Sequence, residues 1–226
     1  MATWSEIKAE IQTEYDLSEE VFVNADELMT YANQGLEELG REIHVINDNY
    51  FSAEAPLALT AGSDEYSLPT NIYANKINLI WYNSGGSPTA IGSVAYEIKP
   101  LKKLTDIASV GPSSLYKYRI KNNTIPKLKF YPASLETSST NVTIFYRREV
   151  SLFTADTDLL DIPEAKQFIK QYVVEKAKNK EAMTPDAPPS DRLSYMKKTL
   201  LDSLEHMIDD DNNEVEINMD HYEESV

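Results

Sequence analysis

Apolar residues recur at helical spacing near both ends of this chain and at alternate positions in its middle. Trp4, Ile7, Ile11 and Tyr15 lie three or four residues apart, which predicts a helix over residues 3–15. A second apolar stripe with the same period predicts another helix that begins after Asn24. Its members are Leu28, Ala32, Leu36, Leu39 and Ile43.

Both N-terminal helices carry a start signal. Thr3 with Glu6, and Asn24 with Glu27, have the spacing of a capping box, in which each side chain satisfies a backbone N–H that the helix leaves free. Gly35 lies within the second stripe and costs about 1 kcal/mol relative to alanine, so we expect close helix packing there.

From residue 51 the apolar period changes to two, which is typical of strands. Residues 77–82 and 141–147 each predict a strand, and residues 116–121 and 126–131 predict a hairpin around Asn122. The hairpin would carry two different faces. One face would be apolar, with Tyr116, Tyr118, Ile120, Leu128 and Phe130, and the other basic, with Lys117, Arg119, Lys121, Lys127 and Lys129.

Helical spacing returns at Pro163, a residue that suits the first turn of a helix. The apolar face of this helix would be Ala165, Phe168, Ile169, Tyr172, Val173 and Ala177. A proline-rich break follows at residues 184–189, and Ser190 or Asp191 would cap a last helix. Its inward residues would be Leu193, Met196, Leu200, Leu204 and Ile208.

These patterns predict an α+β fold. Neither pair of helices is large enough to bury its own stripe, so we expect residues 1–50 and 160–208 to form one helical bundle. An antiparallel β domain, residues 51–159, would be inserted between them. Residues 209–226 are acidic and lack an apolar period, which is typical of a flexible tail.

The charge distribution suggests contacts between proteins. Residues 1–60 carry a net charge of −11, residues 61–150 carry +5, residues 151–204 carry −1 and residues 205–226 carry −9. A chain of net charge −16 is a poor nonspecific binder of nucleic acid. Acidic ends and a basic middle suit contact between copies or with a basic partner, although solubility alone also accounts for an acidic surface.

The sequence offers no catalytic motif, and we expect neither an enzyme nor a cofactor. Without cysteine there are no thiolate ligands or thiol nucleophiles, and the histidines, His44, His206 and His221, lack the short spacing of a zinc site. No Gly-x-Ser-x-Gly elbow is present. No apolar run approaches the roughly 20 residues needed to cross a membrane, so we expect no membrane contact.

The basic positions of the middle region allow three interpretations. They could be an ordinary solvated sheet face, a contact for an acidic partner such as a neighbouring copy, or a contact for the DNA backbone. As an inter-subunit electrostatic face the set comprises Lys117, Arg119, Lys121, Lys127, Lys129, Arg147 and Arg148.

An ordered series of short motifs resembles the head-to-tail adaptor proteins of short-tailed bacteriophages, also called connector, ring or tail tubular protein A-like proteins. The series comprises Trp4, Ala32-Asn33, Gly62, Tyr66-Ser67-Leu68-Pro69, Gly111-Pro112 with Tyr116, Pro132, Phe145-Tyr146-Arg147-Arg148, Leu152 and Asp161-Ile162-Pro163-Glu164. The resemblance covers roughly residues 3–182 and rests on the order of the motifs, since each alone is common.

The resemblance implies a virion structural protein that forms a ring, usually of twelve copies, between portal and tail. Its partners would be the portal protein, other copies of itself, a tail or further ring protein, and viral DNA that passes without sequence-specific binding. It would be assembled in the host cytoplasm. The C-terminal residues would then form a portal-binding arm that includes Met207, Ile208, Asp209, Asp210, Asp211, Val215, Ile217, Met219 and Tyr222.

Two other functions are compatible with the same sequence. A protein- or carbohydrate-binding β module would need exposed aromatic side chains, whereas Tyr116 and Tyr118 are predicted to point inward. A cell-wall hydrolase would need a pair of carboxylates brought together by the fold.

Overall fold

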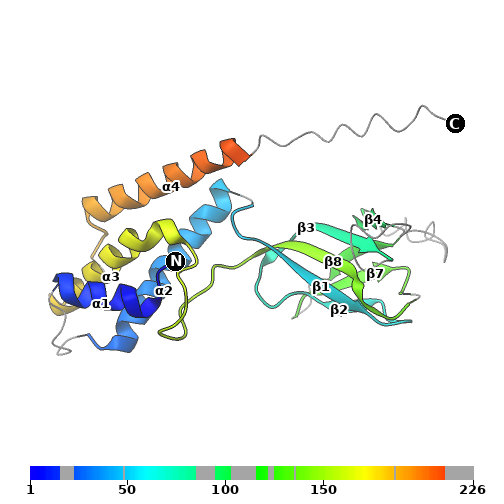
Figure 1. The fold of residues 1–226 in the computed structure, drawn as a ribbon, viewed down its shortest axis with the longest axis horizontal. Coiled ribbons are helices and arrows are strands. Elements are labelled where there is room, and N and C mark those ends of the chain that lie inside the picture. The colour runs from blue at the N-terminus through cyan, green and yellow to red at the C-terminus, as the bar shows by residue number, and fades with distance from the viewer. Residues whose placement is uncertain are drawn as a thin grey trace. The chain divides into compact units, whose positions relative to one another are not determined.

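A computed structural model gives the arrangement of the chain (Figure 1). It describes residues 1–15, 23–47, 49–84, 95–102, 116–121, 125–134, 136–185 and 187–211. The chain divides into two compact units. A helical unit contains Met1–Asn47 and Val150–Val226, and a β unit contains Asp48–Glu149. Within these residues, four α-helices and two sheets confirm the predicted α+β class.

The two N-terminal helices begin where their capping boxes predict. In α1 (Trp4–Tyr15) the backbone N–H of Glu6 donates to Thr3 Oγ1 at 3.3 Å, and the N–H of Thr3 donates to Glu6 Oε2 at 3.0 Å. In α2 (Ala25–Ile46) the N–H of Glu27 donates to Asn24 Oδ1 at 2.9 Å, and Glu27 accepts in return from the Asn24 N–H at 3.1 Å. Local side chains therefore satisfy backbone N–H groups at the start of each helix, and in α1 the N–H groups of Trp4 and Ser5 donate to Asp158 O and Asp156 O, each at 2.9 Å.

The centre of the helical unit is the contact between α2 and α3 (Lys166–Glu181), which follows a short 3-10 turn, η2 (Pro163–Ala165). Every apolar position of the predicted α2 stripe is buried. A Cβ on Gly35 would lie 3.1 Å from Ile169 Cδ1 and 3.2 Å from Tyr172 Cδ1. Gly35 therefore allows the close approach of the two helices that its place in the stripe predicted.

The first helix is held against α3 by apolar and ionic contacts. Trp4, Ile7 and Ile11 are fully buried. Beside them the Lys170 ammonium, on a side chain only 3 % exposed, lies 3.0 Å from Glu10 Oε2 and 2.7 Å from Glu14 Oε1. Because a buried charge is costly without partners, these two carboxylates are what make Lys170 acceptable there.

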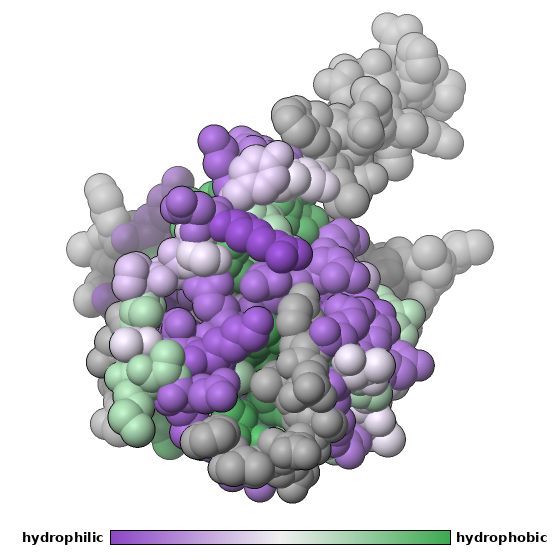
Figure 2. Space-filling view, turned by 90° about the vertical axis from the view of Figure 1, so that its left-hand side faces the viewer, coloured by the Kyte–Doolittle hydropathy of each residue, from purple (hydrophilic) through white to green (hydrophobic). Residues whose placement is uncertain are grey.

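The last helix, α4 (Asp191–Asp211), packs against α2 and α3. Ser190 is its cap, since Ser190 Oγ accepts from the Leu193 N–H at 3.2 Å. Leu193, Leu200 and Leu204 are buried as predicted, whereas Met196 is half-exposed. The helix continues to Asp211, past the predicted end at residue 208. In Figure 2, which faces this unit, hydrophilic side chains cover most of the described surface and hydrophobic ones show between them.

Residues 150–162 belong with the helices, although the sequence analysis placed residues 150–159 in the β domain. The Trp4 N–H donates to Asp158 O at 2.9 Å, and Thr3 forms an isolated β-bridge with Leu159. The Trp4 and Phe153 rings lie 5.1 Å apart. Local sequence favours neither unit for this irregular segment, so these long-range contacts decide its place.

The β unit consists of two four-stranded sheets. The first has the order β1 (Ser52–Leu59), β8 (Ser138–Arg148), β3 (Ile72–Asn83) and β4 (Ala95–Glu97). The second has the order β2 (Glu65–Ser67), β7 (Lys127–Tyr131), β6 (Lys117–Lys121) and β5 (Lys99–Pro100). Among the described strands, every pair is antiparallel except β5 with β6, which are parallel.

The two sheets share one apolar core. The first sheet contributes Leu57, Leu59, Ile80, Val142, Ile144 and Tyr146, and the second contributes Tyr66, Leu128 and Phe130. A turn before β2 contains Gly62, which has φ +80°, a conformation that favours glycine. Alternation along each strand therefore leaves the other face of the second sheet for polar residues.

Candidate functional site: assembly surfaces

The strand register places the basic residues of the second sheet on one face. Residues directly opposite each other on neighbouring strands point to the same side. Lys99 pairs with Lys117, Arg119 pairs with Lys129, and Lys121 pairs with Lys127. We call these six residues the cationic face. The predicted hairpin is confirmed, while Lys99 was missed because β5 is only two residues long and carries no periodicity.

The opposite side of the same hairpin is apolar. Tyr118 lies opposite Phe130 and Ile120 lies opposite Leu128, and both partners on β7 are buried in the core. Tyr116 and Tyr118 pack against that core and are partly buried. The aromatic residues of the hairpin therefore serve packing, which gives little support to a ligand-binding aromatic surface.

Two carboxylates that no sequence pattern connects to the hairpin lie beside the cationic face. Asp64 Oδ2 is 2.5 Å from the Lys129 ammonium, and Glu65, which pairs with Lys129 across β2 and β7, makes an ion pair with Lys121. The hydrogen bond from Lys121 lowers the pKa of Glu65, and the one to Asp64 raises the pKa of Lys129. Part of the positive charge is thus neutralised locally.

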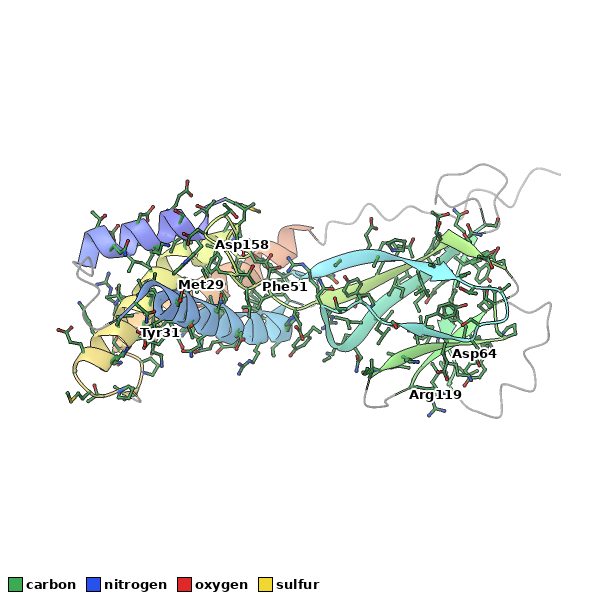
Figure 3. The ribbon with its side chains drawn as sticks, turned by 90° about the horizontal axis from the view of Figure 1, so that it is seen from below. Met29, Tyr31, Phe51, Asp64, Arg119 and Asp158 are labelled. Atoms are coloured by element: carbon green, nitrogen blue, oxygen red, sulfur yellow. The ribbon has the colours of Figure 1, made fainter. Side chains whose placement is uncertain are left out.

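Lys127 Nζ also lies 4.0 Å from Glu65 Oε2, whereas the other three cations of the face are oriented to solvent. Lys99 and Arg119 are exposed and Lys117 is half-exposed. Within the described ranges none of these three makes an ion pair. In Figure 3 the Arg119 side chain extends away from its sheet, and Asp64 is labelled in the same unit. The exposed cations are therefore available to an anionic partner.

Arg147 and Arg148 do not lie on the cationic face. Both belong to β8, in the other sheet. The Arg148 guanidinium lies 5.3 Å from the centre of the Phe51 ring and donates to Glu149 O at 3.0 Å. The structure thus brings together five of the predicted basic residues and places these two elsewhere. Sequence reasoning could not separate them, because sheet order is a tertiary property.

The predicted arm is described only at its beginning. Met207, Ile208, Asp209, Asp210 and Asp211 belong to the backbone of α4. Val215, Ile217, Met219 and Tyr222 lie outside the described residues, as does the Gly111-Pro112 motif.

A groove between α2, α3 and α4 is a second surface that the sequence did not indicate. Its volume is about 490 Å³. Apolar residues, among them Phe168 and Leu193, line it together with charged ones. Lys197 on α4 bridges to Glu38 on α2 at 2.6 Å and to Glu42. Although burial alone lowers the pKa of Lys197, the hydrogen bonds to these carboxylates outweigh it and raise the pKa.

Most motif residues that carry the resemblance hold the fold together. The Tyr66 hydroxyl bonds to the backbone of Thr60 and Ser63, and the Tyr146 hydroxyl donates to Asn71 Oδ1 at 2.9 Å. Asp161 Oδ2 accepts from the Ser151 N–H at 2.8 Å. These residues position turns and strands rather than a reacting group.

The described part of the chain offers no evident site for metal chemistry. Within it, no group of three or more histidine, aspartate or glutamate side chains is placed to hold a metal ion. None of its helices combines the length and the apolar composition that a membrane crossing requires.

Comparison with known proteins found a family match. The model of one protein family, described as SU10 adaptor protein, matches residues 2–216. No curated protein sequence matches the chain. The family match covers both units and reaches beyond α4.

Proposed function

The chain belongs to the SU10 adaptor protein family, and from this premise we propose that it forms a ring between the portal and the tail of a bacteriophage. The membership confirms the resemblance to phage head-to-tail adaptor proteins. A phage adaptor is a structural protein that interacts with other head and tail proteins of the virion. The family match over residues 2–216 is the observation that carries the proposal.

Copies of the chain associate side by side through two different surfaces. Such a heterologous interface closes into a ring when the rotation between neighbours is a simple fraction of a turn, and twelve copies is the number we propose. The cationic face and the acidic parts of the chain provide complementary charge. Such charges set the orientation of partners more than their affinity.

The end of α4 and the residues that follow it form the arm that docks on the portal protein. This segment carries many carboxylates and no Lys or Arg after residue 204. The entropy cost of ordering such a segment is offset by the free energy of binding. The segment therefore becomes ordered only when it docks on its partner.

The ring extends the channel through which viral DNA passes. The net charge of −16 supports a lining that repels the DNA backbone and lets it slide without sequence-specific contacts. The tail, or a further ring protein, docks on the side away from the portal. The protein thus resides at the head–tail junction of the virion and is assembled there in the host cytoplasm.

Electron microscopy with portal rings from the same genome tests this function. Purified chain is mixed with the rings, and class averages are compared with those of portal rings alone. We expect a second coaxial ring beneath the portal, whose copies can be counted directly. A chain that lacks residues 207–226 should leave the portal bare. Intact portals beside monomeric full-length chain would contradict the proposal.

A further inference from the structure

We infer that the cationic face binds the acidic segment, residues 212–226, of a second copy of this chain before the portal protein is met. The inference deepens the proposed function, because it names the surfaces through which copies first recognise each other. It rests on the geometry of the second sheet, on its uncompensated charge and on the composition of the end of the chain.

The cationic face is a regular array. Along β6 the residues Lys117, Arg119 and Lys121 are spaced by two positions, which corresponds to about 7 Å in a strand. Their partners on β5 and β7 lie in the neighbouring strands, about 4.8 Å away. A flat array with this spacing fits an extended polyanion better than a single small anion.

The array keeps an excess of positive charge. Asp64 and Glu65 compensate Lys129 and Lys121, whose ammonium groups they contact, and Glu65 Oε2 also lies 4.0 Å from Lys127 Nζ. Among the described residues, no carboxylate forms an ion pair with Lys99, Lys117 or Arg119. The positive charge of these three residues is therefore not compensated by a neighbouring carboxylate.

The acidic segment has the complementary pattern. Its carboxylates include Glu214, Glu216 and Asp220, two or four residues apart, and it contains neither lysine nor arginine. In an extended conformation residues two apart point to the same side, so these carboxylates would repeat with the spacing of the array. Fifteen extended residues reach about 50 Å, far more than the length of β6 and β7.

A DNA backbone would be the alternative polyanion, but the charge of the whole chain disfavours it. The net charge of −16 repels nucleic acid at long range, while a segment of the same polypeptide is present at every copy. Each copy carries both the face and the segment. In a head-to-tail contact, the face of one copy therefore binds the segment of the next. Portal binding would then compete for the segment and release the face.

Complementation between two full-length variants tests the inference. The face variant carries Lys99→Gln, Lys117→Gln and Arg119→Gln. The segment variant carries Glu214→Gln, Glu216→Gln, Asp220→Asn, Glu223→Gln and Glu224→Gln. Self-association is measured by sedimentation velocity at low salt. We expect each variant alone to associate about tenfold more weakly than the wild type, since single exposed ion pairs contribute little. An equimolar mixture should regain association, because one variant supplies an intact segment and the other an intact face.

Matched controls separate this contact from general charge effects. For the face variant the control neutralises three exposed cations elsewhere, Arg41, Arg192 and Lys198. For the segment variant it neutralises five exposed carboxylates elsewhere, Glu37, Glu97, Glu149, Glu181 and Asp202. Both controls should associate like the wild type. Unchanged association of the face variant would overturn the inference. A mixture of the two variants that stays monomeric would also overturn it and would point to a contact between face and segment within one copy.

Two further measurements distinguish the possible partners. A fluorescent DNA duplex titrated into the segment variant should bind weakly; tight binding that the face variant loses would instead assign the face to DNA. With portal rings, the face variant should bind at least as tightly as the wild type, because no competing contact holds its segment. Failure of all chains to bind portal would contradict the proposed function and leave the complementation result standing.

Discussion

The side chain of Asn33 brackets the backbone of Phe153. Asn33 Nδ2 donates to Phe153 O at 2.9 Å, and the Phe153 N–H donates to Asn33 Oδ1 at 2.8 Å. The pair joins the middle of α2 to the irregular segment that follows the β unit in sequence. One residue of a short motif thus fixes a segment 120 positions away in the chain.

Replacement of Asn33 by alanine should therefore destabilise the helical unit. It leaves a partly buried N–H and C=O without partners, which costs about 1–3 kcal/mol. Urea unfolding followed by circular dichroism measures the loss. The exposed neighbour Gln34, changed to alanine, is the control and should unfold like the wild type. Equal urea midpoints for the Asn33 and Gln34 variants would show that the two hydrogen bonds between Asn33 and Phe153 contribute nothing to stability.

Gly40→Ala tests close packing on the same helix. A Cβ at Gly40 would lie 2.9 Å from Val150 Cγ1 and 3.1 Å from Val150 Cβ. Overpacking typically costs about 1–3 kcal/mol, which outweighs the gain of about 1 kcal/mol in helix propensity. We expect a lower free energy of unfolding. In a Val150→Ala background the contact with Cγ1 is removed while Cβ remains, so the same change should cost less stability. A loss of equal size in both backgrounds would contradict the steric explanation.

Acid should weaken the contact between α1 and α3. Hydrogen bonds from Lys166 and then Lys170 lower the pKa of Glu10 from its ordinary value of 4.5. A carboxyl whose pKa is lower in the folded state contributes stability that is complete above 4.5 and is lost as the pH falls through the folded value. Urea unfolding over a pH series should show the wild type more stable than Glu10→Gln above pH 4.5, with the difference shrinking below it. A difference that does not change with pH would exclude this linkage.

The two ends of the cationic face should respond differently to charge reversal. Lys129→Glu would set a third carboxylate beside Asp64 and Glu65, so we expect a less stable β unit, by about 1–3 kcal/mol. Arg119→Glu, at an exposed position, should change stability by less than about 0.5 kcal/mol. Thermal unfolding of both proteins provides the comparison. Only the Arg119 variant is then suited to a test of ring assembly, and equal stability of the two would refute the role assigned to Asp64.

Local and periodic features were determined by the sequence alone. The capping boxes at Thr3 and Asn24, the apolar stripe around Gly35 and the alternation of the hairpin depend on neighbours within a few residues. Physical rules for helices and strands act over such distances, and these predictions are confirmed.

Features that depend on contacts between residues distant in sequence were decided only by the tertiary structure. The order of the strands separates Arg147 and Arg148 from the cationic face and adds Lys99 to it. The pairing of β2 with β7 brings Glu65 beside Lys129 and Lys121. Asn33 draws the segment around Phe153 to the helices. In each case the deciding contact joins residues that no local pattern relates, because its energy arises from burial and pairing in the folded chain.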